Sequence, residues 1–165
     1  MQWEGLSDEH QGLVRTTQII AFAMTMGVIV FCIVAAVVTM GKPPGEMMLG
    51  YIAVVFTVMT LIARSFVPTV QLKAVRTQML AGEAVDESAR VFPLLRAHQT
   101  KTIIEYALVE GPCFFVLVAY IAVGAHWLLG LAGLLIALLV LTFPTRTRIE
   151  NFIRQQLELL ELEQI

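Results

Sequence analysis

Charged side chains are scarce in this 165-residue chain: they make up 15% of it, while 58% is hydrophobic. Soluble domains usually carry about 25% charged and about 45–50% apolar residues. Residues 17–40 contain no charged residue at all. A run of about 20 apolar residues spans the hydrocarbon layer of a bilayer, which is about 30 Å thick. The shortage of charge therefore excludes an ordinary soluble domain and predicts an integral membrane protein that contacts the lipid bilayer.

Cysteine and histidine are rare as well, with two and three residues. Cys32 and Cys113 lie inside apolar runs, which indicates small packing residues rather than a disulfide or a metal pair. The histidines fall at or beyond the ends of the apolar runs, where a buried haem would find no axial ligand. No phosphate-binding glycine loop and no nucleophile–base arrangement is visible. We therefore expect no catalytic residue, metal or cofactor, and no enzyme.

The apolar runs predict four transmembrane helices, at about residues 17–40, 47–67, 102–123 and 127–143. Pro-Pro flanked by glycines at residues 41–45 and Gly-Ala-His at residues 124–126 predict tight turns. Connections this short predict that the two spans of each hairpin return side by side and antiparallel. In the last span Gly130, Gly133 and Ala137 form a small-residue face that a neighbouring helix can approach closely.

Two polar segments carry amphipathic patterns. Residues 68–101 contain apolar positions interrupted by Pro93, and we expect them to lie on the membrane surface or against the spans. Residues 145–165 predict a single amphipathic helix. Its apolar face consists of Ile149, Phe152, Ile153, Leu157 and Leu160. This face is a candidate interaction surface, and packing on the middle segment, on the membrane or on another subunit all remain open.

The distribution of basic residues predicts the orientation. Four spans place both termini and residues 68–101 on one side of the membrane. Of the eleven Lys and Arg residues, all but Lys42 fall on that side. Cytoplasmic loops carry the excess of Lys and Arg, so we expect both termini in the cytoplasm and the protein in the inner (plasma) membrane. Acids dilute the basic residues of the middle segment, so these indicate headgroup contacts and no nucleic-acid binding.

The two halves of the chain resemble each other. Residues 15–35 align with residues 99–119 without a gap. The matched positions include Thr16 with Thr100, Ile19 and Ile20 with Ile103 and Ile104, Gly27 with Gly111, and Phe31 with Phe115. The predicted fold is an all-α membrane protein of two tandem duplicated hairpins with cytoplasmic amphipathic helices. Residues 1–101 form the first repeat and residues 102–165 the second, related by a pseudo-twofold axis along the membrane normal.

The duplication isolates one carboxylate, because Met26 of the first copy aligns with Glu110 of the second. Glu110 lies eight residues after Thr102, which places it about 12 Å into a layer about 30 Å thick. A carboxylate there is a candidate proton- or ion-binding group. Gly111 and Pro112 follow directly and predict a helix kink, because proline lacks the N–H donor. A neutral Glu110 that bonds a freed backbone carbonyl is the structural alternative.

The stretch Ala-Leu-Val-Glu-Gly-Pro-Cys-Phe-Phe-Val-Leu-Val at residues 107–118 resembles the carboxylate helix of rotary-ATPase proteolipid subunits. That resemblance implies an ion-binding role for Glu110. The chain departs from the family in three respects: it has no glycine-repeat helix, its carboxylate lies on the first helix of a hairpin, and its charges predict the opposite orientation. Over its whole length the chain resembles small four-span bacterial membrane proteins, which names no activity.

Two functions follow as expectations. The first is an interaction subunit that docks partners, or itself as a homo-oligomer or larger membrane complex, through the cytoplasmic amphipathic helices. The alternative is a proton- or ion-handling membrane protein that uses Glu110.

Overall fold

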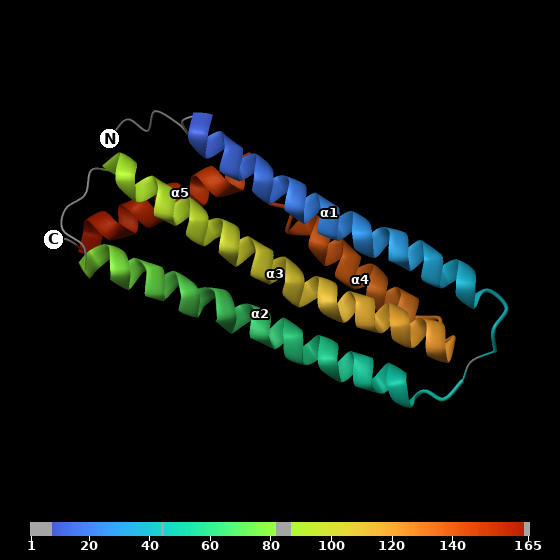
Figure 1. The fold of residues 1–165 in the computed structure, drawn as a ribbon. Helices are drawn as coiled ribbons and strands as arrows, with labels where there is room; N and C mark the ends of the chain where they lie inside the picture. The colour runs from blue at the N-terminus through green and yellow to red at the C-terminus, as the bar shows by residue number, and fades with distance from the viewer. Residues whose placement is uncertain (1–7, 44, 82–86, 164–165) are drawn as a thin grey trace.

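A computed structural model describes residues 8–43, 45–81 and 87–163, with side chains for residues 11–43, 45–66, 95–152 and 154–155. The regular structure in these residues is entirely helical (Figure 1). The helices are α1 (Asp8–Thr39), α2 (Met48–Ala81), α3 (Glu87–Val123), α4 (Trp127–Leu141) and α5 (Arg146–Glu163). The expectation of an all-α protein is confirmed for this part of the chain.

Glycines end two of the long helices at the predicted turns. Gly41 follows α1 with φ of 78°, and Gly124 follows α3 with φ of 71°. This left-handed conformation costs glycine little, because it lacks a Cβ. The N–H of Gly124 donates to the carbonyl of Tyr120 at 2.8 Å. Both turns therefore stop a helix that its apolar sequence would otherwise continue.

Helix α3 is the centre of the fold. It lies between α1 and α2, and α4 packs against α3 and α1 (Figure 1). The connection from α1 to α2 passes the end of α3, where the N–H of Gly45 donates to the carbonyl of Val123 at 2.7 Å. The prediction that α1 and α2 lie side by side is wrong, because α3 occupies the space between them.

This arrangement also lacks the expected pseudo-twofold axis. Such an axis would give α1–α2 and α3–α4 equivalent packing. In the described part of the chain α3 packs extensively on α4, whereas α1 and α2 make no comparable contact. The duplication in the sequence therefore stays a prediction.

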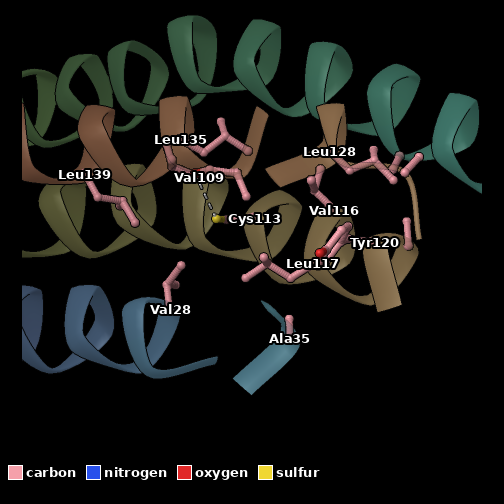
Figure 2. Close-up of a cluster of buried hydrophobic side chains, with 14 of the residues drawn as sticks. Val28, Ala35, Val109, Cys113, Val116, Leu117, Tyr120, Leu128, Leu135 and Leu139 are labelled. Carbon is pink, nitrogen blue, oxygen red and sulfur yellow. Dashed lines mark hydrogen bonds between the residues drawn. The ribbon is translucent and has the colours of Figure 1, made fainter. Parts of the chain in front are cut away.

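Small residues allow the helices to approach closely. Ala35, Ala53, Ala119 and Ala132, one from each of α1 to α4, have no exposed surface. Close backbone approach maximises van der Waals packing, which is the main attraction between helices in lipid. Larger side chains fill the rest of this core, namely Val28, Val109, Val116, Leu117, Leu128 and Leu139 (Figure 2).

Buried hydroxyls in the bundle are satisfied locally. Thr25, Thr39 and Thr57 each donate to the carbonyl four residues earlier, at 2.7–2.8 Å. A polar group without a partner would be costly in an apolar core. The bonds lie within single helices, so these threonines impose no polar contact between helices.

The outer faces of α1 and α2 expose large apolar side chains. In α1 they include Ile19, Phe22, Val30, Ile33 and Val37, and in α2 Tyr51, Val55, Met59, Ile62 and Phe66. Continuous apolar surfaces of this length are unfavourable in water and suited to lipid. The small-residue face of Gly130, Gly133 and Ala137 is exposed too, so none of the described helices covers it.

Three helical stretches are long and apolar enough to cross a membrane, within Gln11–Thr39, Met48–Phe66 and Leu95–Val123. Helix α4 has 15 residues, about 22 Å of helix. That is shorter than a hydrocarbon layer of about 30 Å. A fourth span results only if α4 and Arg146–Phe152 are taken as one span bent by 67°. The described residues thus contain three helices that could span a membrane, or up to four.

The polar segment at residues 68–101 mostly continues the long helices. α2 runs through Pro68 to Ala81, and α3 already begins at Glu87 and passes Pro93. Neither proline ends its helix.

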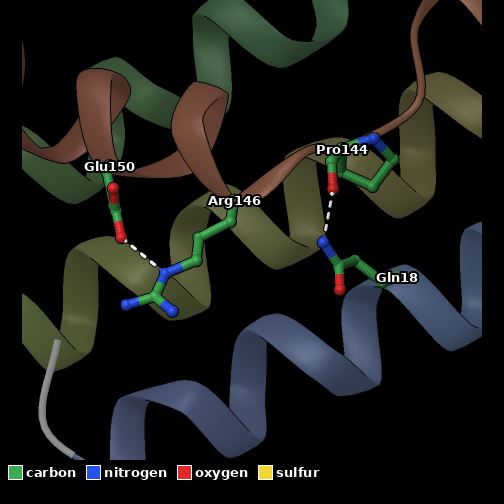
Figure 3. A network of polar contacts seen from close by, with 4 residues as sticks. All are labelled: Gln18, Pro144, Arg146 and Glu150. Atoms are coloured by element: carbon green, nitrogen blue, oxygen red, sulfur yellow. Dashed lines mark hydrogen bonds and ion pairs between the residues drawn. The ribbon is translucent and has the colours of Figure 1, made fainter.

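The corner between α4 and α5 is fixed by polar contacts. The side-chain amide of Gln18 in α1 donates to the carbonyl of Pro144 at 3.1 Å (Figure 3). At the start of α5, the Nε of Arg146 donates to the carboxylate of Glu150, one turn later, at 2.7 Å. The end of α4 therefore lies beside the early part of α1. The start of α1 and the end of α5 lie at the same end of the described bundle (Figure 1).

Candidate functional site

Glu110 lies on the central helix, one turn before Phe114 and on the same face. The Phe114 ring packs against Phe31 of α1, with centroids 5.2 Å apart and an interplanar angle of 59°. Glu110 therefore sits on the side of α3 that faces α1. Its side chain is partly buried, and among the described residues it has no hydrogen bond and no ion pair. An unpaired carboxylate in an apolar span is the strongest candidate for a functional group.

Two glycines leave space at the depth of Glu110. Phe31 and Phe114 are in contact, and α1 and α3 run in the same direction (Figure 1). Gly27 lies one turn before Phe31, and Glu110 lies one turn before Phe114. Gly27 and Glu110 are therefore at about the same depth. Gly27 and Gly111 are both exposed, and a Cβ added to either would meet no atom within 4 Å. Both glycines therefore lie at the surface of the described bundle, near the depth of the carboxylate.

The Gly111–Pro112 step lies inside one continuous helix. The Pro112 ring is fully buried and fills part of the core, whereas Gly111 faces outward. Proline removes one N–H from the helix ladder. The expected kink stays a prediction.

A second acid on α3 has a partner. The carboxylate of Glu105 lies 3.7 Å from the ammonium group of Lys101, one turn earlier. This is the ion pair that the spacing favours. Glu105 therefore provides a paired comparison for the unpaired Glu110.

Both cysteines are free thiols. Cys113 is fully buried, and its thiol lies 3.7 Å from the carbonyl of Ala132 in α4. The interpretation of both residues as packing residues agrees with these positions.

The sequence analysis missed a polar contact between α3 and α4. The hydroxyl of Tyr106, which is buried, donates to the carbonyl of Leu139 at 2.9 Å. The sequence contained a signal for this contact. Tyr106 aligns with Phe22 in the other half, so the second copy carries a hydroxyl that the first lacks. A tyrosine buried in an apolar core usually has a partner for its hydroxyl.

The predicted apolar face of α5 is partly used within the chain. Ile149 is 1% exposed and packs in a small cluster with Val14 of α1 and Leu95 of α3. Phe152 packs against the same cluster, with its ring centroid 4.6 Å from that of His98. Ile153, Leu157 and Leu160 lie outside the described side chains. The first two turns of α5 therefore pack on the chain itself, at Val14 of α1 and Leu95 of the middle segment.

Among the described residues, no group of three or more His, Cys, Asp or Glu side chains could hold a metal ion. No protein-family model matches the chain, and neither the curated proteins nor the solved structures contain a match.

Proposed function

We propose that the protein is an interaction subunit of the inner (plasma) membrane, with both termini cytoplasmic, that docks partners through a cytoplasmic helical platform. The platform consists of residues 67–81 of α2, the first turns of α3, and α5. Charge supports this orientation, because ten of the eleven basic residues lie at that end if α4 returns through the membrane.

The observation that carries the proposal is an asymmetry of length. Helix α2 has 34 residues and α3 has 37, which corresponds to about 50 and 55 Å of helix. A hydrocarbon layer about 30 Å thick leaves roughly 20 Å of each helix outside it. The connection from α3 to α4, by contrast, has three residues. Nearly all structure beyond the bilayer therefore gathers at one end.

Helix α5 completes the platform. The cluster of Val14, Leu95 and Ile149 fixes its first turns against α1 and α3. The apolar positions farther along, at Ile153, Leu157 and Leu160, continue the pattern of a helix with one apolar face. An anchored helix loses less conformational entropy on binding than a disordered tail, so it favours docking.

The test is a pair of substitutions beyond the anchored turns. Replacing Leu157 and Leu160 by serine is expected to lower the native mass of the detergent-solubilised protein, because the partner or second copy dissociates. Mass is measured by light scattering during size-exclusion chromatography. Gln155→Ser, at an exposed position, is the control and should keep the wild-type mass. The proposal fails if the wild type is a lone monomer, or if the double variant keeps the wild-type mass.

A second function is favoured by Glu110, a partly buried carboxylate on the central helix that has no partner among the described residues. Such a group can bind a proton or cation in the membrane. If the protein conducts protons or ions, Glu110→Gln should reduce the flux into proteoliposomes about tenfold or more, since the amide cannot ionise. Glu105→Gln is the matched control and should leave the flux largely unchanged. Equal flux in wild type and Glu110→Gln, with normal folding, would exclude this function.

A further inference from the structure

Arg64 lies on the inward face of α2. It follows Gly50, Ala53 and Thr57 at helical spacing, and these three residues are buried against the bundle. Arg64 itself is partly buried and has no ion pair or hydrogen bond among the described residues. The positive charge of an arginine that faces a bundle without a carboxylate partner must be balanced by another negative or polar group.

The depth of Arg64 follows from the contact between α2 and α4. A Cβ added to Gly50 would lie 3.1 Å from the Trp127 ring and 3.6 Å from Leu128. Both helices run antiparallel to α3, so they run in the same direction (Figure 1). Arg64 lies fourteen residues after Gly50, and Thr142 lies fourteen residues after Leu128. Arg64 therefore lies at the depth of the C-terminal end of α4.

A second arginine, from α5, lies at the same depth. The Nη1 of Arg148 donates to the carbonyl of Leu141 at 2.9 Å, at the last turn of α4. The Tyr106 hydroxyl, which is bonded to the carbonyl of Leu139, belongs to the same end of α4. Arg64 of α2 and Arg148 of α5 thus lie at the same depth, at the end of α4 where the chain bends by 67°.

Among the described side chains, no carboxylate is paired with either of these two arginines. The nearest acid on α5, Glu150, is paired with Arg146 at 2.7 Å. Glu105 of α3 is paired with Lys101. The C-terminal carbonyls of α4 compensate about half of one positive charge. As far as the described side chains go, the notch formed by Arg64, Arg148 and the end of α4 therefore retains net positive charge.

We propose that this notch binds a phosphate group, with the headgroup of an anionic phospholipid as its source. Arg64 lies 16 residues along α2 from Met48, about 24 Å into a layer about 30 Å thick, and so near the headgroups. Guanidinium groups bind phosphate oxygens in a bidentate manner. Basic notches between transmembrane helices on the cytoplasmic side suit lipid phosphates. This site includes Arg148 at the start of the α5 docking helix, but it lies apart from Leu157 and Leu160 and from Glu110.

The test measures lipid binding to the full-length protein in detergent by native mass spectrometry. Phosphatidylglycerol, phosphatidylcholine and inorganic phosphate are the probes. We expect phosphatidylglycerol to be retained more strongly than phosphatidylcholine. The Arg64→Gln/Arg148→Gln variant should lose about tenfold or more in affinity, since two charge-assisted contacts are removed. The control is Arg15→Gln. Arg15 is an exposed arginine near the start of α1, at the same end of the bundle as Arg64 and Arg148, and this variant should bind the lipid as the wild type does.

Competition identifies the source of the phosphate. If inorganic phosphate displaces the lipid at matched concentration, the site takes free phosphate; if it does not, the site takes the lipid. If the double variant does not fold, Arg64→Lys is used instead. It keeps the positive charge beside α4 but loses the planar guanidinium group, so its affinity for phosphatidylglycerol should be lower than that of the wild type but not lost. The proposal is overturned if phosphatidylglycerol binds no better than phosphatidylcholine, or if the arginine variants and Arg15→Gln bind equally.

Discussion

Leu117→Ala is expected to lower the free energy of unfolding by about 2–3 kcal/mol, the lower part of the range for buried leucines. Leu117 lies on the central helix with no exposed surface, in the core that α1, α3 and α4 share (Figure 2). Truncation leaves a cavity whose lining loses van der Waals contacts. The value falls low in the range because lipid tails are as apolar as leucine, so the transfer contribution is small.

The neighbouring residue provides the control for this experiment. Val118 is 47% exposed, so Val118→Ala should change stability by less than about 0.5 kcal/mol. Unfolding can be followed by circular dichroism while dodecyl sulfate replaces a mild detergent. Equal destabilisation by the two substitutions would mean that α3 is not the buried centre of the bundle.

Ala35→Leu is expected to destabilise the protein by about 3 kcal/mol, the upper part of the range for overpacked cores. Ala35 has no exposed surface and lies where α1 meets α3 (Figure 2). Three added carbon atoms must push the helices apart or force side chains out of their rotamers. Both responses remove close contacts that hold helices together in lipid.

Ala23→Leu is the matched control on the same helix. Ala23 is exposed, so the larger side chain can extend into lipid without displacing a neighbour. We expect Ala23→Leu to unfold at the wild-type detergent fraction, while Ala35→Leu unfolds earlier or fails to assemble. A tolerated Ala35→Leu would contradict the close packing of α1 on α3.

The two proposals meet in α5. Arg148, which contributes to the phosphate notch, directly precedes Ile149, which anchors α5 to α1 and α3. A lipid bound at Arg148 would therefore stabilise the corner from which the docking helix extends. The substitutions at Leu157 and Leu160 lie beyond this corner, so the two proposals can fail independently.

Much of the secondary structure followed from the sequence alone. The scarcity of charge and the long apolar runs determine helices, because in a bilayer the backbone must satisfy its own hydrogen bonds. Gly41 and Gly124 end helices at the predicted turns. The Lys101–Glu105 pair follows from spacing within one helix. Each of these features is local, and nearby residues suffice to specify it.

The tertiary structure decided which faces meet. Lipid and protein interior are both apolar, so hydrophobic periodicity does not distinguish a buried helix face from an exposed one. The central place of α3, the outward face of Gly130 and Gly133 and the inward turn of Arg64 depend on contacts between distant segments. Gln18 with Pro144, and Tyr106 with Leu139, are such contacts. The sequence therefore determined the helices, and packing between small residues and a few polar bonds decided their arrangement.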